Sequence, residues 1–226
     1  MKLENVCFKY GKNVILENIS YEFESGKIYG IVGHNGAGKT TLLRTILGLL
    51  APTSGAIKKN NNTVFSYIPE KQGIYEDLTV SENIRISSGL HNEENVCNID
   101  KLLSKWQLNK NKDTLGKHLS TGQLARLKFI CCSVSDSNVL IADEPTLGVD
   151  ARTNKLMETE FINQKKNGKI VIITSHNIKF IESICDEVII INNHNIVFEG
   201  KISQIQNFEE LYLEYTEEDD EDEDDN

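Results

Sequence analysis

The sequence has 226 residues, of which 39% are hydrophobic, and a formal net charge of −10 at pH 7. Nine of the negative charges are consecutive, from Glu217 to Asp225, and removing these nine from −10 leaves −1 for the rest of the chain. That nearly neutral body lacks the basic excess of nucleic-acid-binding proteins, and no run of about 18 uncharged apolar residues predicts a transmembrane helix. The length suits one α/β domain with a sizeable core.

The two ends of the chain and its cysteines give further expectations. We expect residues 213–226 to form a disordered acidic tail, because consecutive like charges cannot fold against one another. The alternative is an ionic contact between this tail and a basic loop of a partner, which salt would weaken. The N-terminus lacks the apolar core of a signal peptide, and the five cysteines show no CxxC spacing. Buried thiols in a reducing cytosol are therefore expected, rather than disulfides or metal ligands.

The predicted elements begin with strands over residues 3–32 and a helix over 39–48. Turns at 51–55 and 60–62 and a strand over 64–68 follow. Residues from about 72 to 134 are expected to be mainly helical, with a helix over 93–108 and capping boxes at Thr79 and Ser120 opening two others. Strand and helix then alternate over 139–142, 151–166, 169–174, 177–184, 187–192 and 195–199. This order predicts an α/β fold of the P-loop NTPase class, with a mostly parallel sheet, an N-terminal antiparallel β-subdomain and an inserted helical subdomain.

The segment from 33 to 40 reads Gly-His-Asn-Gly-Ala-Gly-Lys-Thr and matches the phosphate-binding pattern G-x-x-x-x-G-K-[ST]. An apolar run precedes this loop and a helical pattern follows it, so phosphates would meet the free N–H groups of a helix N-terminus. Lys39 is expected to reach the β- and γ-phosphates, and the Thr40 hydroxyl to bind Mg²⁺. The predicted nucleotide-binding residues here are Gly33, His34, Asn35, Gly36, Ala37, Gly38, Lys39, Thr40 and Thr41.

Two carboxylates follow the apolar run at 139–142. A buried central strand presents acids only at its C-terminal edge, where the phosphate loop is also expected. Asp143 is therefore expected to hold Mg²⁺, and Glu144 to polarise the water that attacks the γ-phosphate.

A second candidate anion site lies in Leu119-Ser120-Thr121-Gly122-Gln123. A helix that starts at Ser120 offers a hydroxyl, small residues and exposed N–H groups. Taken alone, an ordinary capped helix is the more common interpretation.

Together these motifs resemble those of the nucleotide-binding subunits of ATP-binding cassette (ABC) transporters, over about residues 1–205. GHNGAGKT corresponds to Walker A, LSTGQ at 119–123 to the signature LSGGQ, and VLIADEP at 139–145 to Walker B. The resemblance further implies that Asp150 belongs to the D-loop, that His176 is the switch histidine, and that Tyr10 stacks on adenine.

The resemblance implies an ABC-type ATP-binding domain over residues 1–212 that uses ATP and Mg²⁺. Two such domains would pair head to tail, so that Ser120, Thr121, Gly122 and Gln123 of one copy meet ATP held by the other. Lys39, Glu144, His176 and Asp150 would form the catalytic set. The implied partners are a second nucleotide-binding subunit, identical or closely related, and separate transmembrane subunits, which places the chain at the cytoplasmic face of the cell membrane.

The sequence departs from the family pattern in four places, one of which is the slightly atypical D-loop Leu-Gly-Val-Asp, where Asp150 is retained. Glu70 occupies the position of the Q-loop glutamine, where it is expected to lie at the nucleotide and its metal, and Gln72 is the alternative if the loop register differs. Thr121 replaces a signature glycine, and the segment from 55 to 67 is shorter than the usual strand-rich arm. None of these changes removes Lys39 or Glu144, so an active ATPase is expected.

The leading functional hypothesis is the energy-coupling subunit of a transporter. The segment from Pro69 to Asn83 resembles that of bacterial exporters of peptides, antibiotics or drugs. The alternatives are a soluble cassette ATPase that acts on ribosomes or DNA and a scaffold for cofactor assembly. The single cassette and the nearly neutral body speak against ribosome or DNA binding, and a kinase would have no use for the signature helix.

Overall fold

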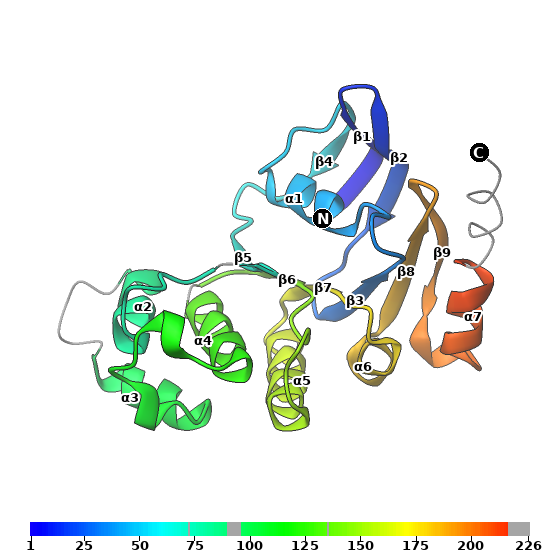
Figure 1. Ribbon diagram of the computed structural model, residues 1–226. Coiled ribbons are helices and arrows are strands. Elements are labelled where there is room, and N and C mark those ends of the chain that lie inside the picture. Colours follow the sequence, from blue (N-terminus) through cyan, green and yellow to red (C-terminus); the bar gives the residue numbers. More distant parts are fainter. Residues whose placement is uncertain (72, 90–95, 135, 217–226) are drawn as a thin grey trace, which may run out of the picture.

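A six-stranded sheet forms the centre of the computed structural model, which describes residues 1–71, 73–89, 96–134 and 136–216 (Figure 1). Its strand order is β5-β6-β7-β3-β8-β9, and all neighbours are parallel except β8 and β9. The strands are β5 (Phe65–Ile68), β6 (Val139–Asp143), β7 (Ile170–Thr174), β3 (Lys27–Val32), β8 (Glu187–Asn192) and β9 (Asn195–Lys201). Every residue of β6 and β7 is buried, as expected for parallel strands covered on both faces. The predicted mostly parallel sheet is confirmed.

A separate antiparallel sheet, β2-β1-β4, confirms the predicted N-terminal β-subdomain. It consists of β1 (Lys2–Tyr10), β2 (Asn13–Glu22) and β4 (Ser54–Lys58). The prediction of a turn over 51–55 is wrong for its last two residues, because Ser54 and Gly55 belong to β4 and Ser54 pairs with Cys7 of β1. Gly55 adopts a φ of 81°, and a Cβ there would lie only 2.1 Å from the Asn5 carbonyl oxygen. This glycine therefore lets two backbones approach within the sheet, rather than ending a turn.

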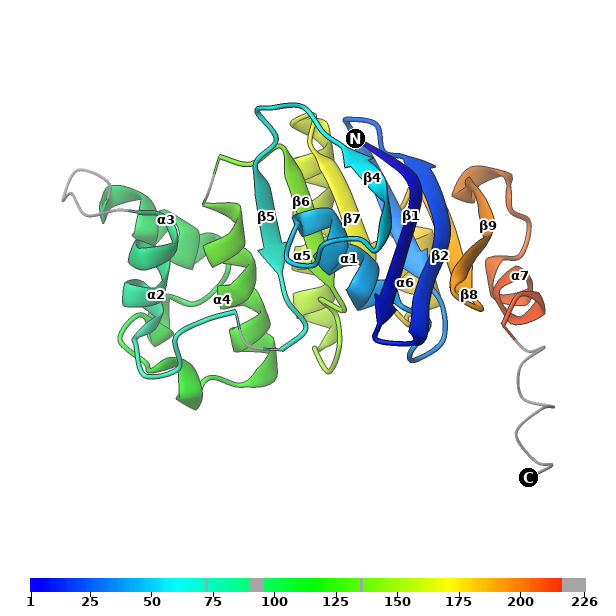
Figure 2. The ribbon, with the colours of Figure 1, turned by 90° about the horizontal axis from the view of Figure 1, so that it is seen from above.

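Helices and the small sheet cover the two faces of the central sheet (Figures 1 and 2). Helix α1 (Lys39–Leu47) lies with the antiparallel sheet on one face, and α5 (Ala151–Lys166) and α6 (Ile178–Ile184) lie on the other. The side chains of β3 alternate accordingly. Tyr29 and Ile31 belong to the core under α1, whereas Ile28 and Val32 belong to the core under α5 and α6.

The predicted helical subdomain contains α2 (Val80–Ser87), α3 (Val96–Lys105) and α4 (Thr121–Ser133), with short 3₁₀ turns at Asn109–Asn111 and Gly116–His118. Both predicted capping boxes are present, at Thr79 and at Ser120. Trp106 stacks on Phe129 of α4 with ring centroids 4.8 Å apart, and Phe129 packs on Phe161 of α5 at 5.0 Å. This aromatic row joins the subdomain to the central core.

A C-terminal helix, α7 (Phe208–Glu214), follows a 3₁₀ turn at Ile202–Gln204 and was not predicted. Asn207 caps it by accepting from the backbone N–H of Glu210. The expectation of a disordered tail is wrong for its first residues, because α7 continues to Glu214 and the Tyr215 ring packs 5.6 Å from that of Phe198. The acidic run itself, 217–225, lies outside the described residues, as does Gln72. None of the described helices combines the length and apolar character needed to cross a membrane.

Candidate active site

The phosphate loop connects β3 to α1. At two of its glycines, a side chain would clash with neighbouring backbone. A Cβ at Gly33 would lie 2.3 Å from the Ile191 carbonyl oxygen, and one at Gly38 would lie 2.9 Å from that of Ile15. Gly38 also has a φ of 98° and precedes α1 without any side-chain cap. The first N–H groups of α1 therefore remain available to a ligand.

The Lys39 side chain curls under this loop and is only 8% exposed. Its ammonium group donates to the carbonyl oxygens of Gly33 (2.7 Å) and His34 (2.9 Å) and lies 3.4 Å from Nε2 of His176. Burial lowers the pKa of Lys39, while the charges of Glu144 and Asp143 act in the opposite direction. A buried cation that faces two carboxylates is a strong site for phosphate oxygens.

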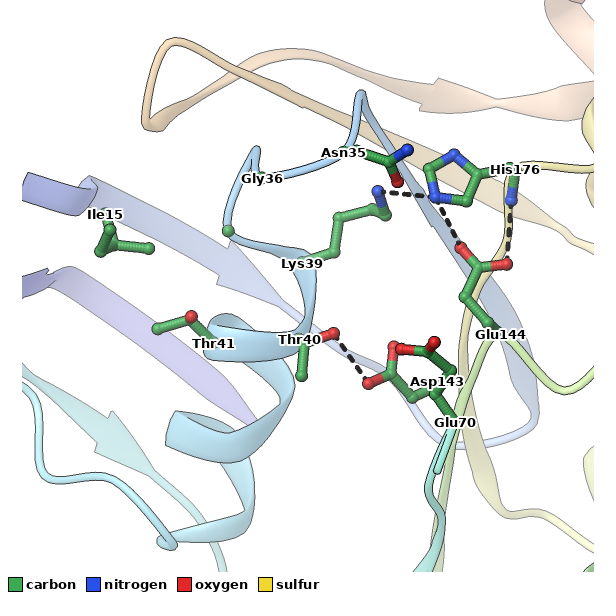
Figure 3. Close-up of a pocket in the computed structure, with 11 residues that line it drawn as sticks. Ile15, Asn35, Gly36, Lys39, Thr40, Thr41, Glu70, Asp143, Glu144 and His176 are labelled. Carbon is green, nitrogen blue, oxygen red and sulfur yellow. Dashed lines mark hydrogen bonds and ion pairs between the residues drawn. The ribbon is translucent and has the colours of Figure 1, made fainter. Parts of the chain in front are cut away.

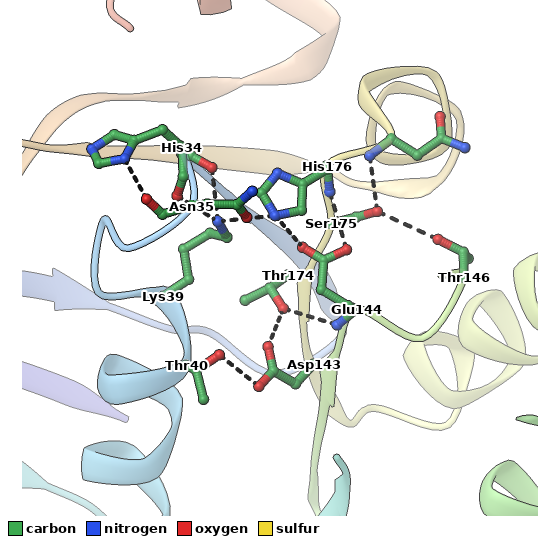
Figure 4. Close-up of polar contacts among 12 residues, drawn as sticks. His34, Asn35, Lys39, Thr40, Asp143, Glu144, Thr146, Thr174, Ser175 and His176 are labelled. Carbon is green, nitrogen blue, oxygen red and sulfur yellow. Dashed lines mark hydrogen bonds and ion pairs between the residues drawn. The ribbon is translucent and has the colours of Figure 1, made fainter. Parts of the chain in front are cut away.

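Asp143 ends β6 and is 2% exposed. Its Oδ2 accepts from the Thr40 hydroxyl at 2.8 Å, and its Oδ1 accepts from the Thr174 hydroxyl at 2.6 Å (Figure 4). The Tyr67 hydroxyl also donates to Oδ2, at 3.5 Å. Helix α1 and strands β5 and β7 thus each supply a hydroxyl that fixes this carboxylate.

Glu144 follows in a left-handed conformation, with a φ of 48° that is uncommon for a residue with a side chain. Its N–H donates to the Thr174 hydroxyl at 3.0 Å. Its Oε2 accepts from the backbone N–H of His176 at 3.2 Å, and its Oε1 lies 3.2 Å from the imidazole Nε2. The reversed backbone thereby turns this carboxylate away from β6 and toward His176.

Burial has opposite effects on these two neighbours. It raises the pKa of Glu144, against a smaller lowering by the His176 backbone N–H. It lowers the pKa of His176, and the Lys39 charge adds to that lowering. The pair therefore combines a carboxylate of raised basicity with an imidazole that is neutral at pH 7.

These groups meet in a cavity of about 300 Å³ (Figure 3). Its lining consists of Ile15, Asn35, Gly36, Gly38, Lys39, Thr40, Thr41, Glu70, Asp143, Glu144 and His176. Eight of the sixteen residues predicted to bind nucleotide or metal are therefore brought together here, namely Asn35, Gly36, Gly38, Lys39, Thr40, Thr41, Glu70 and Asp143. Tyr10 is not among the lining residues. This residue is 51% exposed, and its ring packs edge-on against that of Phe8 with centroids 4.8 Å apart.

The sequence and the fold have clear relatives. The pattern of the ABC transporter family matches residues 16–147. An uncharacterised ABC transporter ATP-binding protein of Methanocaldococcus jannaschii is 33% identical over 218 residues, which cover 95% of this chain and 82% of that protein. The ABC-type transporter ATP-binding protein EcsA of Bacillus subtilis is 31% identical over 97% of both chains. The chain belongs to the ABC transporter family.

Further similarities are consistent with this family. A zinc import ATP-binding protein of Buchnera aphidicola is 33% identical over 86% of this chain and 81% of its own length, and a Nod factor export ATP-binding protein of Cupriavidus metallidurans is 30% identical over 89% and 71%. The structure of an ATP-binding subunit of an ABC transporter superposes with a TM-score of 0.86 at 26% identity, over 95% of this chain and 98% of that one. A dimeric cassette in a post-hydrolysis state with ADP and Pi has the same fold, with a TM-score of 0.78 at 22% identity over 89% and 98%. As an ABC ATP-binding subunit, the protein binds and hydrolyses ATP.

The predicted signature residues, 120–123, lie in a second group and are not among the residues that line the cavity. Ser120 caps α4, and its hydroxyl accepts from the N–H of Gln123. A Cβ at Gly122 would lie 3.0 Å from Oδ2 of Asp150, and one at Gly148 would lie 3.5 Å from Cγ2 of Thr121. The segment with Gly148 and Asp150, predicted to be the D-loop, therefore packs directly on the first turn of α4.

Asp150 itself caps α5, with its Oδ1 accepting from the N–H of Thr153 at 2.8 Å. That hydrogen bond is the main reason why the pKa of Asp150 is lowered. Asp150 and residues 120–123 are thus brought together with each other, but not with Lys39 and Glu144.

Sequence reasoning missed three residues of the site: Ile15, Tyr67 and Thr174. Thr174 stands directly opposite Asp143 in the β6–β7 pairing. The polar threonine at the end of an apolar strand was the only sequence signal for it. Ile15 and Tyr67 carry no such signal, because their place depends on how β2 and β5 are positioned against α1 and β6.

Proposed function

We propose that this chain is the ATP-hydrolysing, energy-coupling subunit of an ABC exporter, and that its complete site forms between two subunits paired head to tail. The observation that carries this proposal is that the phosphate-loop residues and the predicted signature residues of one chain lie in separate places. Lys39, Thr40 and Glu144 line the cavity, whereas Ser120 and Gly122 do not. A second subunit that turns its signature helix toward the cavity would supply the missing N–H and hydroxyl donors for the γ-phosphate.

The residues at the end of β6 suit Mg²⁺. Mg²⁺ prefers oxygen ligands and usually keeps only one or two protein ligands beside phosphate and water. Thr40 Oγ1 and Asp143 Oδ2 are such oxygens, 2.8 Å apart, and the described residues contain no group of three His, Cys, Asp or Glu side chains placed to hold a metal by themselves. Bound Mg²⁺ would neutralise charge on the β- and γ-phosphates. Glu70 also lines the cavity, and its carboxylate could supply a further oxygen to the ion.

Hydrolysis then depends on Glu144 and its neighbours. The carboxylate accepts a proton from the attacking water, and its raised pKa suits a general base. His176 orients Glu144 through its backbone N–H, and its neutral imidazole can donate to the γ-phosphate. Lys39 exchanges its loop carbonyls for phosphate oxygens and stabilises the developing charge. Asp150 positions the signature turn toward the partner, and Tyr10 provides an exposed ring for adenine.

ATP at such an interface joins the two subunits, so hydrolysis would weaken the pairing and reopen it. We propose that separate transmembrane subunits at the cytoplasmic face of the membrane follow this opening and closing. The relatives named above include both an import and an export protein. The proposed direction, export, rests on the segment from Pro69 to Asn83.

Glu144→Gln tests the paired site, because it should keep ATP binding while it slows turnover. Size-exclusion chromatography with light scattering is run with and without Mg²⁺-free ATP. We expect a monomer that becomes a dimer only with ATP. A variant that binds ATP, stays monomeric and hydrolyses at the normal rate contradicts both the paired site and the role of Glu144.

The direction of transport needs a second experiment. The membrane subunits that co-purify with the tagged chain are assayed in inverted membrane vesicles with labelled antimicrobial peptides as probes. An exporter accumulates a probe inside these vesicles when ATP is added outside. ATP-driven release of a preloaded probe would show import instead.

A further inference from the structure

Lys128 connects the signature helix to the loop that carries Glu70. Its ammonium group, on α4, donates to the carbonyl oxygens of Pro69 at 3.3 Å and Glu70 at 2.9 Å. These carbonyls belong to the segment that leaves β5 and enters the helical subdomain. One side chain of the helical subdomain therefore holds the backbone at the edge of the nucleotide cavity.

The loop also folds over the lysine. Gly73 has a φ of 96°, and a Cβ there would lie 2.8 Å from Cγ of Pro69 and 3.8 Å from Cδ of Lys128. The apolar stem of Lys128 thus packs against the turn, while its charged end is directed to the carbonyls. A half-buried cation with two acceptors in this arrangement has little freedom to leave.

Glu70 shares the cavity with the groups assigned to hydrolysis. Its side chain lines the same cavity as Glu144 and His176. The position of the Glu70 carboxylate therefore matters to the groups that surround the reacting phosphate.

We propose that Lys128 is a positioning residue for hydrolysis, which keeps Glu70 at the cavity by holding its backbone and thereby ties the signature helix to the site in the same chain. Ser120 begins that helix eight residues earlier, about 12 Å away along its axis. A displacement of the signature turn would therefore be transmitted to Glu70 through Lys128. This inference rests on the proposed place of Glu70 beside the nucleotide.

The test compares four full-length variants with the normal chain: Lys128→Met, Lys128→Arg, Glu70→Ala, and Lys128→Met combined with Glu70→Ala. Steady-state hydrolysis gives kcat and KM, and ATP binding is measured separately in EDTA. Lys155→Met is the matched control, because Lys155 is an exposed lysine of α5 that pairs only with Glu158 among the described residues.

We expect Lys128→Met to lower kcat about tenfold, since a small displacement of a group at a reacting centre costs factors of this order. ATP binding in EDTA should change less than about twofold, because the phosphate loop is intact. Lys128→Arg should restore most of kcat, since a guanidinium can donate to both carbonyls. In the Glu70→Ala background, Lys128→Met should lower kcat by less than about twofold, because the group it positions is gone.

A full tenfold loss in the Glu70→Ala background, or a normal kcat for Lys128→Met, would overturn the proposal. If Lys128→Met does not fold, Lys128→Gln replaces it, because the glutamine amide can donate to only part of the same pair. If the proposed function itself is wrong, the result is different: both Glu70→Ala and Glu144→Gln hydrolyse ATP at the normal rate.

Discussion

The Thr40 hydroxyl donates to Oδ2 of Asp143 at 2.8 Å, across 103 positions of the sequence. This contact joins the phosphate loop at the start of α1 to the end of β6. Both residues stand at the carboxyl edge of the parallel sheet, where β3 and β6 end on either side of β7. Two short motifs that are remote in sequence therefore make one site because parallel strands end at a common edge.

The first prediction concerns the hydrogen bond from Tyr67 to Asp143 and its effect on Mg²⁺ binding. Its hydroxyl donates to Oδ2 from 3.5 Å, which is a long hydrogen bond, so the effect of losing it should be small. We expect Tyr67→Phe to raise the Mg²⁺ concentration needed for half-maximal hydrolysis about two- to threefold, with kcat at saturating Mg²⁺ nearly unchanged. Tyr21→Phe is the control, because the Tyr21 hydroxyl donates to Glu187 away from the cavity. An unchanged Mg²⁺ dependence for Tyr67→Phe would remove Tyr67 from the site.

The charged Glu144 carboxylate should lower the stability of the folded protein at neutral pH. Its folded pKa is raised by burial, so the folded state binds this proton more tightly than the unfolded state does. Its contribution to stability is therefore complete below the ordinary carboxyl pKa and is lost as pH rises through the higher, folded pKa. We expect Glu144→Gln to have a higher Tm than the normal chain at pH 7, with the gap closing toward pH 4. A lower Tm at pH 7 would contradict the raised pKa.

The raised pKa of Glu144 also predicts how the rate of hydrolysis falls at acid pH. A general base must be deprotonated, so kcat/KM, which reports the groups of the free enzyme, should fall as pH drops through the raised pKa of Glu144. The fall should therefore occur above the ordinary range of a glutamate. Hydrolysis measured from pH 5 to 8 checks this, and a rate that stays constant down to the ordinary carboxyl range would exclude Glu144 as the titrating base.

The sequence indicated most of the fold, because its signals are local. A phosphate loop between an apolar run and a helical pattern, two capping boxes and an apolar strand that ends in Asp143 and Glu144 each need fewer than about ten residues to be seen. The structure confirms the strands and helices at these places. What remained hidden depends on contacts between distant segments.

Thr174 and Tyr67 illustrate that limit. Thr174 reaches Asp143 only through the register of β6 against β7, and Tyr67 only through that of β5 against β6. No local pattern fixes such registers. Helix α7 was missed for another reason, since it is short and acidic and leads toward the charged run that favoured a tail. Its cap at Asn207 was the available signal.

Gly122 should be required for the contact between the signature helix and the D-loop. A Cβ there would lie 3.0 Å from Oδ2 of Asp150 and 3.2 Å from Oγ1 of Thr153. Gly122→Ala should therefore displace the start of α4 or of α5 and destabilise the chain by about 1–3 kcal/mol. We expect hydrolysis to fall at least about tenfold, while ATP binding by the monomer persists.

The control for this change is Gly11→Asn, because a Cβ at Gly11 meets nothing within 4 Å and asparagine tolerates its φ of +60°. Thermal unfolding, ATP binding and hydrolysis are compared for both variants. A Gly122→Ala chain with normal hydrolysis would show that the close packing of Gly122 on Asp150 is not needed for function.

The acidic run gives the last prediction. Deletion of residues 217–226 removes nine carboxylates and changes the net charge from −10 to −1. The described residues that line the cavity all lie between Ile15 and His176 in the sequence. We expect kcat and KM of the isolated subunit to change less than about twofold, because charges in water are screened beyond about 10 Å at 0.1 M salt. The measurement is hydrolysis at low and high salt. A large loss on deletion would contradict the inert tail. A gain that appears only at low salt would instead show that the tail acts on the nucleotide site through its charge.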